Sequence, residues 1–193
     1  MQAPTSTFGL LERIKAGERE AFDQLFVRYR PRLAVLIHYK LSPELRRTAE
    51  VDDVLQETLL RAWRDLERFE YRTPGSFLRW LASIADHVII DAARAQARQC
   101  RAGVQVPFRS ESNPRGPEPA DSRTPSRVLA EHQAVEALLA RLDALPGDYR
   151  QAILLSKIEG LSTAEMAERL GRSREAASLL LHRAVKRFRE LAG

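Results

Sequence analysis

Residues 161–191 read LSTAEMAERLGRSREAASLLLHRAVKRFREL, and this stretch decides the fold of the C-terminal part of the chain. Ser162 and Glu165 have the spacing of a capping box, in which each side chain accepts a hydrogen bond from the other residue's backbone at a helix start. Gly171 tolerates the left-handed backbone of a tight turn. Ser173 is then placed to cap a second helix that runs to the end of the stretch. A short helix, a glycine turn and a longer basic helix together predict a helix-turn-helix.

The longer helix has two unlike faces. On a helical wheel, the predicted buried face consists of Ala177, Leu181, Ala184, Phe188 and Leu191, with Leu180 and Val185 at its margins. The predicted DNA-facing surface consists of Arg172, Arg174, Glu175, Ser178, Leu179, His182, Arg183 and Lys186. The N-terminal half of such a helix reads base edges in the major groove, while flanking basic groups bind phosphates.

A plainer interpretation of this polar face remains open, since any surface helix carries a solvated side. Leu179 favours DNA, because an outward leucine is costly on a merely solvated face and can contact a thymine methyl group. A protein contact at Leu179 would explain it too. His182 has no metal-binding or catalytic partner within sequence reach, and stays open between a DNA contact and an ordinary exposed residue.

The rest of the chain also favours helices. Apolar residues recur at helical spacing, and no stretch of four or more residues alternates as a strand does. Apolar stripes over 22–37, 51–66 and 77–92 predict three helices that close into a small bundle. Pro31 marks a kink or a fresh helix start in the first of them. The predicted fold class is all-α.

Two helical domains are expected. From about residue 99 to 127 the helical pattern stops, and Pro, Gly and Ser predict a flexible linker. We therefore expect a first domain over 1–98, a linker over 99–127 and a second domain over 128–193. The second domain begins with two further helices, one of which opens at Pro146, ahead of the helix-turn-helix.

Composition excludes several classes of protein. The single cysteine, Cys100, cannot form an internal disulfide, and the four histidines are scattered, so no metal site and no cofactor are expected. No charge-free stretch approaches the roughly 20 residues of a membrane span. The first 20 residues lack the apolar segment of a secretory signal, so a cytoplasmic protein is expected, without membrane insertion. The formal net charge of +5, carried by arginine, hints at nucleic acid.

Two separate motif sets, in this order and spacing, resemble a known family. They read AEVDDVLQETLLRAW over 49–63 and FEYRTPGSFLRWLASIADHVIIDAARAQAR over 69–98, and after the Pro-rich stretch LDALPGDYRQAILLSKIEGLSTAEMAERLGRSREAASLLLHRAVKRFREL over 142–191. The chain thus resembles the extracytoplasmic-function (ECF) subfamily of bacterial RNA polymerase sigma factors. The resemblance covers both expected domains.

The resemblance implies an alternative sigma factor that binds core RNA polymerase and directs it to promoters. The first domain would correspond to sigma region two, which binds the β′ clamp and opens the minus-ten element. The second would be region four, which reads the minus-thirty-five element and touches the β flap. The linker would stand in for region three and enter the channels of the polymerase. Such a protein would lie on the nucleoid when bound to polymerase, and whether an anti-sigma factor is a further partner stays open.

The resemblance also implies roles for residues of the first domain. The expected polymerase-binding residues are Asp52, Asp53, Gln56, Glu57, Leu60 and Arg61. Four of them recur three or four residues apart beside the buried stripe, and we expect Asp53 and Glu57 to be exposed. The plainer alternative is a solvated face. A metal or hydrolase site at the paired aspartates lacks any second acidic cluster or histidine partner.

The expected minus-ten residues are Phe69, Tyr71, Arg72, Ser76, Arg79, His87, Arg94 and Arg98. In the family, the loop 69–76 captures an unstacked base, which aromatic walls can stabilise. Phe69 and Phe77 could instead be plain core residues. Relatives often have Asn at the position of His87, and this departure concerns local hydrogen bonding rather than the fold. They also often have a basic or polar residue near Leu179 and Leu180, so the apolar residues here point to an unusual upstream sequence.

Two other functions compete with a sigma factor. The first is a helix-turn-helix regulator that binds duplex DNA without replacing sigma. It accounts for residues 128–193 but assigns no function to the first helical bundle. An enzyme with a nucleic-acid-binding tail is disfavoured, because no Ser-His-Asp, P-loop, HExxH or CxxC spacing occurs. No catalytic residue is expected.

Overall fold

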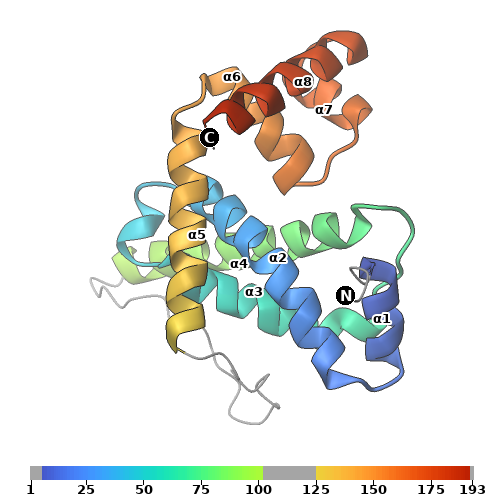
Figure 1. Cartoon of the computed structure of the whole chain (residues 1–193). Coiled ribbons are helices and arrows are strands. Elements are labelled where there is room, and N and C mark those ends of the chain that lie inside the picture. Colours follow the sequence, from blue (N-terminus) through green and yellow to red (C-terminus); the bar gives the residue numbers. More distant parts are fainter. Residues whose placement is uncertain (1–5, 102–124, 192–193) are drawn as a thin grey trace. The chain divides into compact units, whose positions relative to one another are not determined.

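The computed structural model describes residues 6–101 and 125–191, and the chain divides into two compact units, Met1–Ser122 and Arg123–Gly193 (Figure 1). The described residues are helical with no strand, which confirms the predicted all-α class. None of their helices has the length and apolar character needed to cross a bilayer.

Within residues 6–101, the first unit consists of four α-helices and the turns between them. They are α1 (Thr7–Lys15), α2 (Arg19–Lys40), α3 (Val51–Asp65) and α4 (Ser76–Arg101), with short 3-10 turns at Leu45–Arg47 and Leu66–Arg68. The stripes predicted over 51–66 and 77–92 correspond to α3 and α4. Helix α2 runs through Pro31 without a new start, so the proline does not divide it into two helices.

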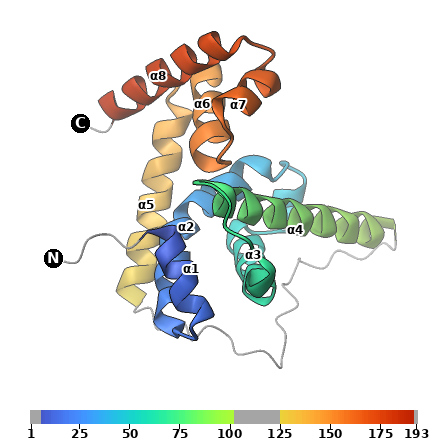
Figure 2. The same cartoon turned by 90° about the vertical axis from the view of Figure 1, so that its right-hand side faces the viewer.

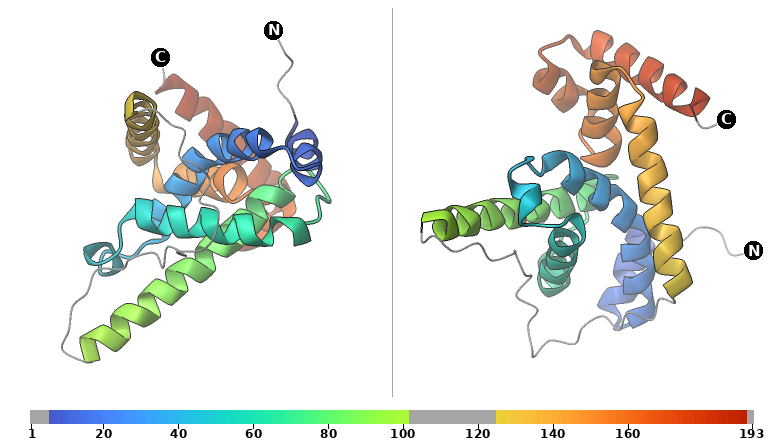
Figure 3. Two further views of the ribbon diagram at one scale, coloured as in Figure 1. Left: turned by 90° about the horizontal axis from the view of Figure 1, so that it is seen from below. Right: turned by 90° about the vertical axis from the view of Figure 1, so that its left-hand side faces the viewer.

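The core of this unit lies where α4 meets α3 and α2. One face of α4 is buried along most of its length, through Phe77, Leu81, Ala85, Val88 and Ala92. This face follows the predicted stripe, although Trp80 and Ile84 are only half-buried. Beyond residue 92 the buried face ends, and the C-terminal part of α4 extends past the other helices of the unit (Figures 2 and 3).

Helix α1 was not predicted from the sequence. Ser6 caps it by accepting a hydrogen bond from the backbone N–H of Gly9 at 3.0 Å. Leu10 and Leu11 are buried, and α1 packs on α2. A nine-residue amphipathic helix gives too short a periodic signal to stand out, and it is stabilised by tertiary packing rather than by its own propensity.

The second unit carries the predicted helix-turn-helix. Its helices are α5 (Pro125–Asp143), α6 (Gly147–Ile153), α7 (Thr163–Leu170) and α8 (Arg174–Glu190), with a π-helical turn at Leu154–Ile158. Helix α5 and α4 each extend a few residues into the range predicted as linker, and residues 102–124 of that range lie outside the described residues.

The turn between α7 and α8 forms as the sequence predicts. The Ser162 backbone donates to Glu165 Oε2 at 2.7 Å, and the Glu165 backbone donates to Ser162 Oγ at 3.3 Å. Gly171 adopts a left-handed conformation with φ of 62°. Ser173 Oγ accepts from the Ala176 backbone at 3.2 Å and caps α8. The capping box, the glycine turn and the second cap are therefore confirmed.

The buried face of α8 lies slightly off the predicted one. Ala177, Leu180 and Ala184 are buried, whereas Leu181 is only half-buried. The prediction placed Leu181 on the buried face and Leu180 at its margin. Because α8 packs against both α6 and α7, the seam between those two helices, rather than the mean apolar direction of α8, decides which leucine is covered.

The left-handed turn allows a stability test with a matched control. Gly171→Ala should lower the free energy of unfolding of the second unit by about 1 kcal/mol, because a Cβ is disfavoured at positive φ. A Cβ would meet no atom within 4 Å at either Gly171 or Gly147, and only Gly171 has a positive φ. Gly147→Ala should therefore be neutral or stabilising. Urea unfolding followed by circular dichroism measures both, and equal effects would contradict the backbone argument.

Candidate functional site

The outward face of α8 gathers the residues predicted to contact DNA. All eight are exposed: Arg172, Arg174, Glu175, Ser178, Leu179, His182, Arg183 and Lys186. Leu179 exposes 50% of its surface, as an outward-facing leucine should. The structure therefore brings the predicted set together on one helix face and its N-terminal turn.

Several cations on this face are free to bind an anion. Among the described residues, Arg174, Arg183 and Lys186 form no ion pair. Arg172 has only a long contact, 3.9 Å from its Nη2 to Asp148 Oδ2, between two exposed side chains. An exposed pair of this kind contributes little to stability and exchanges readily for a phosphate. The face can thus combine phosphate binding with an apolar base contact at Leu179.

Helix α3 presents only part of the expected polymerase-binding set. Asp52 and Gln56 are exposed, and Asp53 and Leu60 are half-buried. Asp52 lies 3.9 Å from a guanidinium nitrogen of Arg30. These four side chains form a mixed polar and apolar strip of the kind found at protein interfaces.

Glu57 is not exposed, contrary to the expectation from its helical position. Only 7% of its surface is accessible, and its Oε1 accepts a hydrogen bond from Arg61 Nε at 2.8 Å. The residue borders the buried stripe of α3, next to the buried Val54 and Thr58, and Arg61 one turn later contacts its carboxylate. The carboxylate therefore acts inside the unit rather than at its surface.

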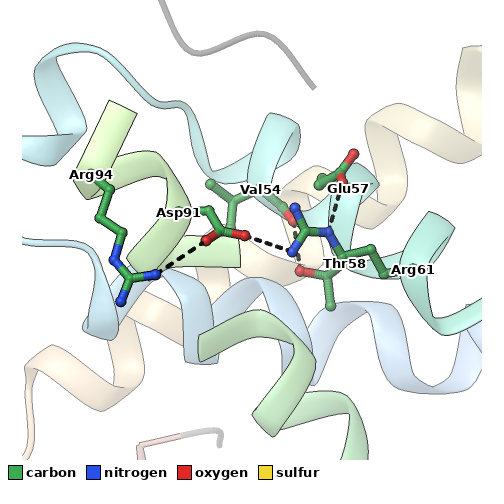
Figure 4. A network of polar contacts seen from close by, with 6 residues as sticks. All are labelled: Val54, Glu57, Thr58, Arg61, Asp91 and Arg94. Carbon is green, nitrogen blue, oxygen red and sulfur yellow. Dashed lines mark hydrogen bonds and ion pairs between the residues drawn. The ribbon is translucent and has the colours of Figure 1, made fainter. Parts of the chain in front are cut away.

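Arg61 joins α3 to α4 (Figure 4). Besides the bond to Glu57, its Nη1 donates to Asp91 Oδ2 at 2.8 Å, and Asp91 Oδ1 lies 3.9 Å from Arg94 Nη1. Burial acts to lower the pKa of Arg61, but the hydrogen bonds that it donates to Asp91 and Glu57, together with their negative charges, outweigh burial and raise that pKa. The guanidinium stays charged and holds two carboxylates from two helices.

A second ion pair fixes the middle of α4. Lys40 Nζ, at the end of α2, lies 2.7 Å from Asp86 Oδ1. Neither this pair nor the pair of Arg61 and Asp91 has a pattern in the sequence, because their members lie 46 and 30 residues apart. The bond between Glu57 and Arg61 had a visible signal, the i,i+4 spacing of opposite charges.

The loop before α4 differs from expectation at Phe69. This ring is 9% exposed and packs on Phe77 and Trp80, with ring centroids 5.3 Å and 4.8 Å away. Phe69 is thus largely buried, as its interpretation as a core residue predicts. Tyr71 is half-buried, and its ring lies 5.6 Å from that of Phe8 on α1.

The polar residues of the loop and of α4 are more accessible. Arg72 is exposed and pairs with the equally exposed Glu70 at 3.1 Å. The half-buried Arg79 donates to Thr73 Oγ1 at 3.4 Å, whereas Ser76 Oγ is buried and has no hydrogen-bond partner among the described residues. Three further predicted residues, His87, Arg94 and Arg98, are exposed on α4.

Metal-ligand groups do not assemble in the part of the chain that the structure describes. No cluster of three or more His, Cys, Asp or Glu residues that could hold an ion occurs there. The paired aspartates of α3 therefore gain no third ligand within residues 6–101 and 125–191.

Comparison with known proteins decides between the remaining functions. A family model described as ECF sigma factor matches residues 5–191. The chain belongs to the ECF sigma factor family. It is 35% identical over 184 residues to the RNA polymerase sigma factor CarQ of Myxococcus xanthus, and the match covers 95% of each chain. It is 28% identical to the ECF RNA polymerase sigma-E factor of Escherichia coli K12, over 82% of this chain and 79% of that one.

Solved structures of similar proteins were also found. One is CnrH in complex with the cytosolic domain of CnrY, with 24% identity, a TM-score of 0.42, and coverage of 98% of this chain and 97% of that chain. Another is the sigma factor RpoE of Bartonella quintana in complex with the anti-sigma factor NepR, with 22% identity, a TM-score of 0.41, and coverage of 89% and 96%.

Membership of this family establishes the general function. ECF sigma factors are alternative sigma factors that bind core RNA polymerase and direct it to promoters, and they are initiation factors rather than enzymes. The enzyme hypothesis is thereby set aside. The alternative of a helix-turn-helix regulator would now require that this chain differ in function from the rest of its family.

The contacts of Arg61 predict a non-additive effect on stability. Arg61→Met should lower the free energy of unfolding of the first unit by about 2 kcal/mol, because it removes a charged hydrogen bond from the largely buried Glu57 carboxylate. Adding Glu57→Gln should recover part of that loss, since a neutral amide is less costly to bury. Chemical unfolding of the wild type, both single variants and the double variant measures the coupling. Strict additivity would show that the two side chains do not interact.

Proposed function

We propose that this ECF sigma factor divides promoter recognition between its two units. Residues 1–98 bind the β′ clamp of core RNA polymerase and open the minus-ten element. Residues 128–193 read the minus-thirty-five element and touch the β flap. Residues 99–127 serve as the linker that enters the polymerase channels. The separate compact units and the family match over 5–191 support this division.

The observation that carries the proposal is the outward face of α8. It follows a capped glycine turn, and it combines an exposed leucine with three cations that form no ion pair among the described residues. A recognition helix needs both features, since phosphate contacts give position and base contacts give sequence preference. Arg174, Arg183 and Lys186 are these three cations, Arg172 in the turn before α8 is a fourth with only a long contact to Asp148, and Leu179 supplies an apolar contact.

The polymerase-binding surface is proposed to be the strip formed by Asp52, Asp53, Gln56 and Leu60. Glu57 and Arg61 support it from inside, because their bonds tie α3 to α4. The minus-ten surface follows on α4 and the loop before it. Its proposed members are Tyr71, Arg72, Ser76, Arg79, His87, Arg94 and Arg98. Arg94 and Arg98 lie one turn apart and can hold the backbone of a separated strand.

The experiment that tests this function uses purified core RNA polymerase and a genomic DNA library. Core polymerase with the chain should initiate transcription at a specific set of start sites, and core alone should not. The free chain should bind duplex DNA only weakly at physiological salt, because one helix with few cations gives a small electrostatic contribution. Tight, specific binding by the free chain without core binding would favour the regulator. A protein of this function acts in the cytoplasm, where polymerase and nucleoid lie.

Charge reversal on α3 should weaken binding to core polymerase. Asp53→Arg should lower the affinity about fivefold or more, as expected when an interface residue contributes at least about 1 kcal/mol. Helical content should not change, because a partly exposed position tolerates substitution. Asp65→Arg is the matched control, since Asp65 is exposed near the other end of α3 and faces a different direction. Fluorescence anisotropy with labelled chain measures both, and equal affinities would remove Asp53 from the interface.

Two substitutions on α8 should act differently on the upstream element. Arg174→Ala removes a group that can bond a guanine edge or a phosphate, whereas Leu179→Ser removes an apolar contact. Loss of a base-reading arginine should cost about 1–3 kcal/mol at one position, and loss of a phosphate contact should weaken all promoters alike. Leu179→Ser should shift preference at a thymine-bearing position by less.

Transcription from a library randomised across the upstream element measures both effects on α8. A preference profile unchanged by Leu179→Ser, together with weaker core binding, would mean that Leu179 faces a protein. In that case the proposed orientation of α8 on DNA would be wrong.

A further inference from the structure

One of the two aromatic side chains in the loop before α4, that of Phe69, is buried in the core of the first unit. Phe69 is 9% exposed and packed between Phe77 and Trp80, so taking up a base there would require the core to open. Tyr71 is the only other aromatic residue in the range 69–76. An unstacked base is usually held between two side-chain surfaces, and a single half-buried ring provides only one of them.

A second aromatic ring reaches this loop from α1. Phe8 lies 5.6 Å from Tyr71 between ring centroids, and the two ring planes are inclined at 53°. Phe8 still exposes 51% of its surface, so Tyr71 covers only part of it. Inclined rings at this distance are a favourable aromatic pair, and they leave ring surface open to a third planar group.

The position of Phe8 is fixed by its neighbours in the sequence. Ser6 caps the helix through the Gly9 backbone at 3.0 Å, and Thr7 Oγ1 lies 2.9 Å from the hydroxyl of Tyr29 on α2. Leu10 is fully buried on the other side of the helix start. The ring is therefore held at the loop before any ligand arrives, which lowers the entropy cost of binding there.

Positive charge lies beside the aromatic pair along the chain. Arg72 follows Tyr71 directly, and its exposed partner Glu70 can be exchanged for a phosphate. Arg79 donates to Thr73 of the same loop. Aromatic rings together with guanidinium groups are the combination that binds single-stranded nucleic acid, with bases on the rings and the backbone on the cations.

We propose that Phe8 is the second aromatic wall of a base-binding site on the first unit, and that α1 is thereby part of the surface that binds the separated promoter strand. The occupant is an unstacked base of single-stranded DNA, stacked on Phe8 and bordered by Tyr71. This inference rests on the proposed minus-ten function of the unit, and it extends that function to a helix outside the loop and α4.

The test uses the full chain bound to core polymerase. The probe is the nontemplate strand of a promoter mapped with the wild-type holoenzyme, prepared intact and with an abasic site at each position in turn. The variants are Phe8→Ala, Phe8→Leu, which keeps apolar volume without a ring, and Phe8→Tyr, which keeps the ring. Leu129→Ala is the control, because Leu129 is also a large apolar side chain, 59% exposed, and lies in the other unit.

Phe8→Ala and Phe8→Leu should each bind the intact strand about fivefold or more weakly, the lower end of the effect of losing one base stack. Phe8→Tyr and Leu129→Ala should bind as the wild type does. In the wild type, one abasic position should weaken binding, and in Phe8→Ala that position should lose its effect. Affinity for core polymerase should be the same for all variants.

Three results would overturn the proposal for Phe8 alone. They are unchanged strand binding by Phe8→Ala, full binding by Phe8→Leu, and a loss of core affinity, which would mean that Phe8 faces the polymerase. A wild-type holoenzyme that fails to bind any nontemplate strand would instead overturn the minus-ten function, and the base site with it. Circular dichroism of each variant separates these results from misfolding.

Discussion

Burial of one face of α4 sets the position of nearly every functional side chain in the first unit. At its start, Phe77 holds Phe69 and so fixes where the loop between α3 and α4 begins. Further along, Val88 and Ala92 are buried, which turns Asp91 towards α3. Burying each large apolar side chain contributes about 1.5–3 kcal/mol. Apolar burial is non-directional, so by itself it does not fix the position of α4 along its own axis relative to α2 and α3.

The ion pairs supply that register. Lys40 with Asp86, and Arg61 with Asp91, join α4 to α2 and α3 at two points along its length. Exposed or partly exposed pairs of this kind contribute about 0–1 kcal/mol each, too little to drive folding. Their effect is geometric, because a shifted helix would leave a carboxylate and a cation unmatched. Glu57 is the exception, since its carboxylate is largely buried where it accepts a hydrogen bond from Arg61.

The sequence predicted local structure well and long-range contacts poorly. The capping box at Ser162, the turn at Gly171 and the cap at Ser173 depend on residues three or fewer positions apart, and all form as predicted. The burial of Glu57 and of Phe69 depends instead on what packs over them from another helix or a later turn. A helical wheel gives the direction of a side chain, but whether another segment covers that side chain depends on the tertiary structure.

The same distinction applies to function. The outward face of α8 was readable because its chemistry lies on one helix, whereas the aromatic pair of Phe8 and Tyr71 joins residues 63 positions apart and has no pattern in the sequence. Helix α1, too short to stand out by periodicity, supplies one of its two rings. Sites assembled from distant segments therefore need the fold before their members can be recognised.

The charges on the two units bear on how promoter specificity arises. The three cations of α8 without an ion pair among the described residues would contribute a salt dependence of only about −3 in log affinity per log salt. Such a helix binds DNA weakly when alone, and Arg94 and Arg98 add little more on α4. In the proposed function, however, polymerase holds both units at once, so binding of the first unit would raise the effective concentration of the second at its own element. Weak separate contacts then become a strong joint one only at promoters that carry both elements, so the modest charge of each unit favours selectivity over affinity.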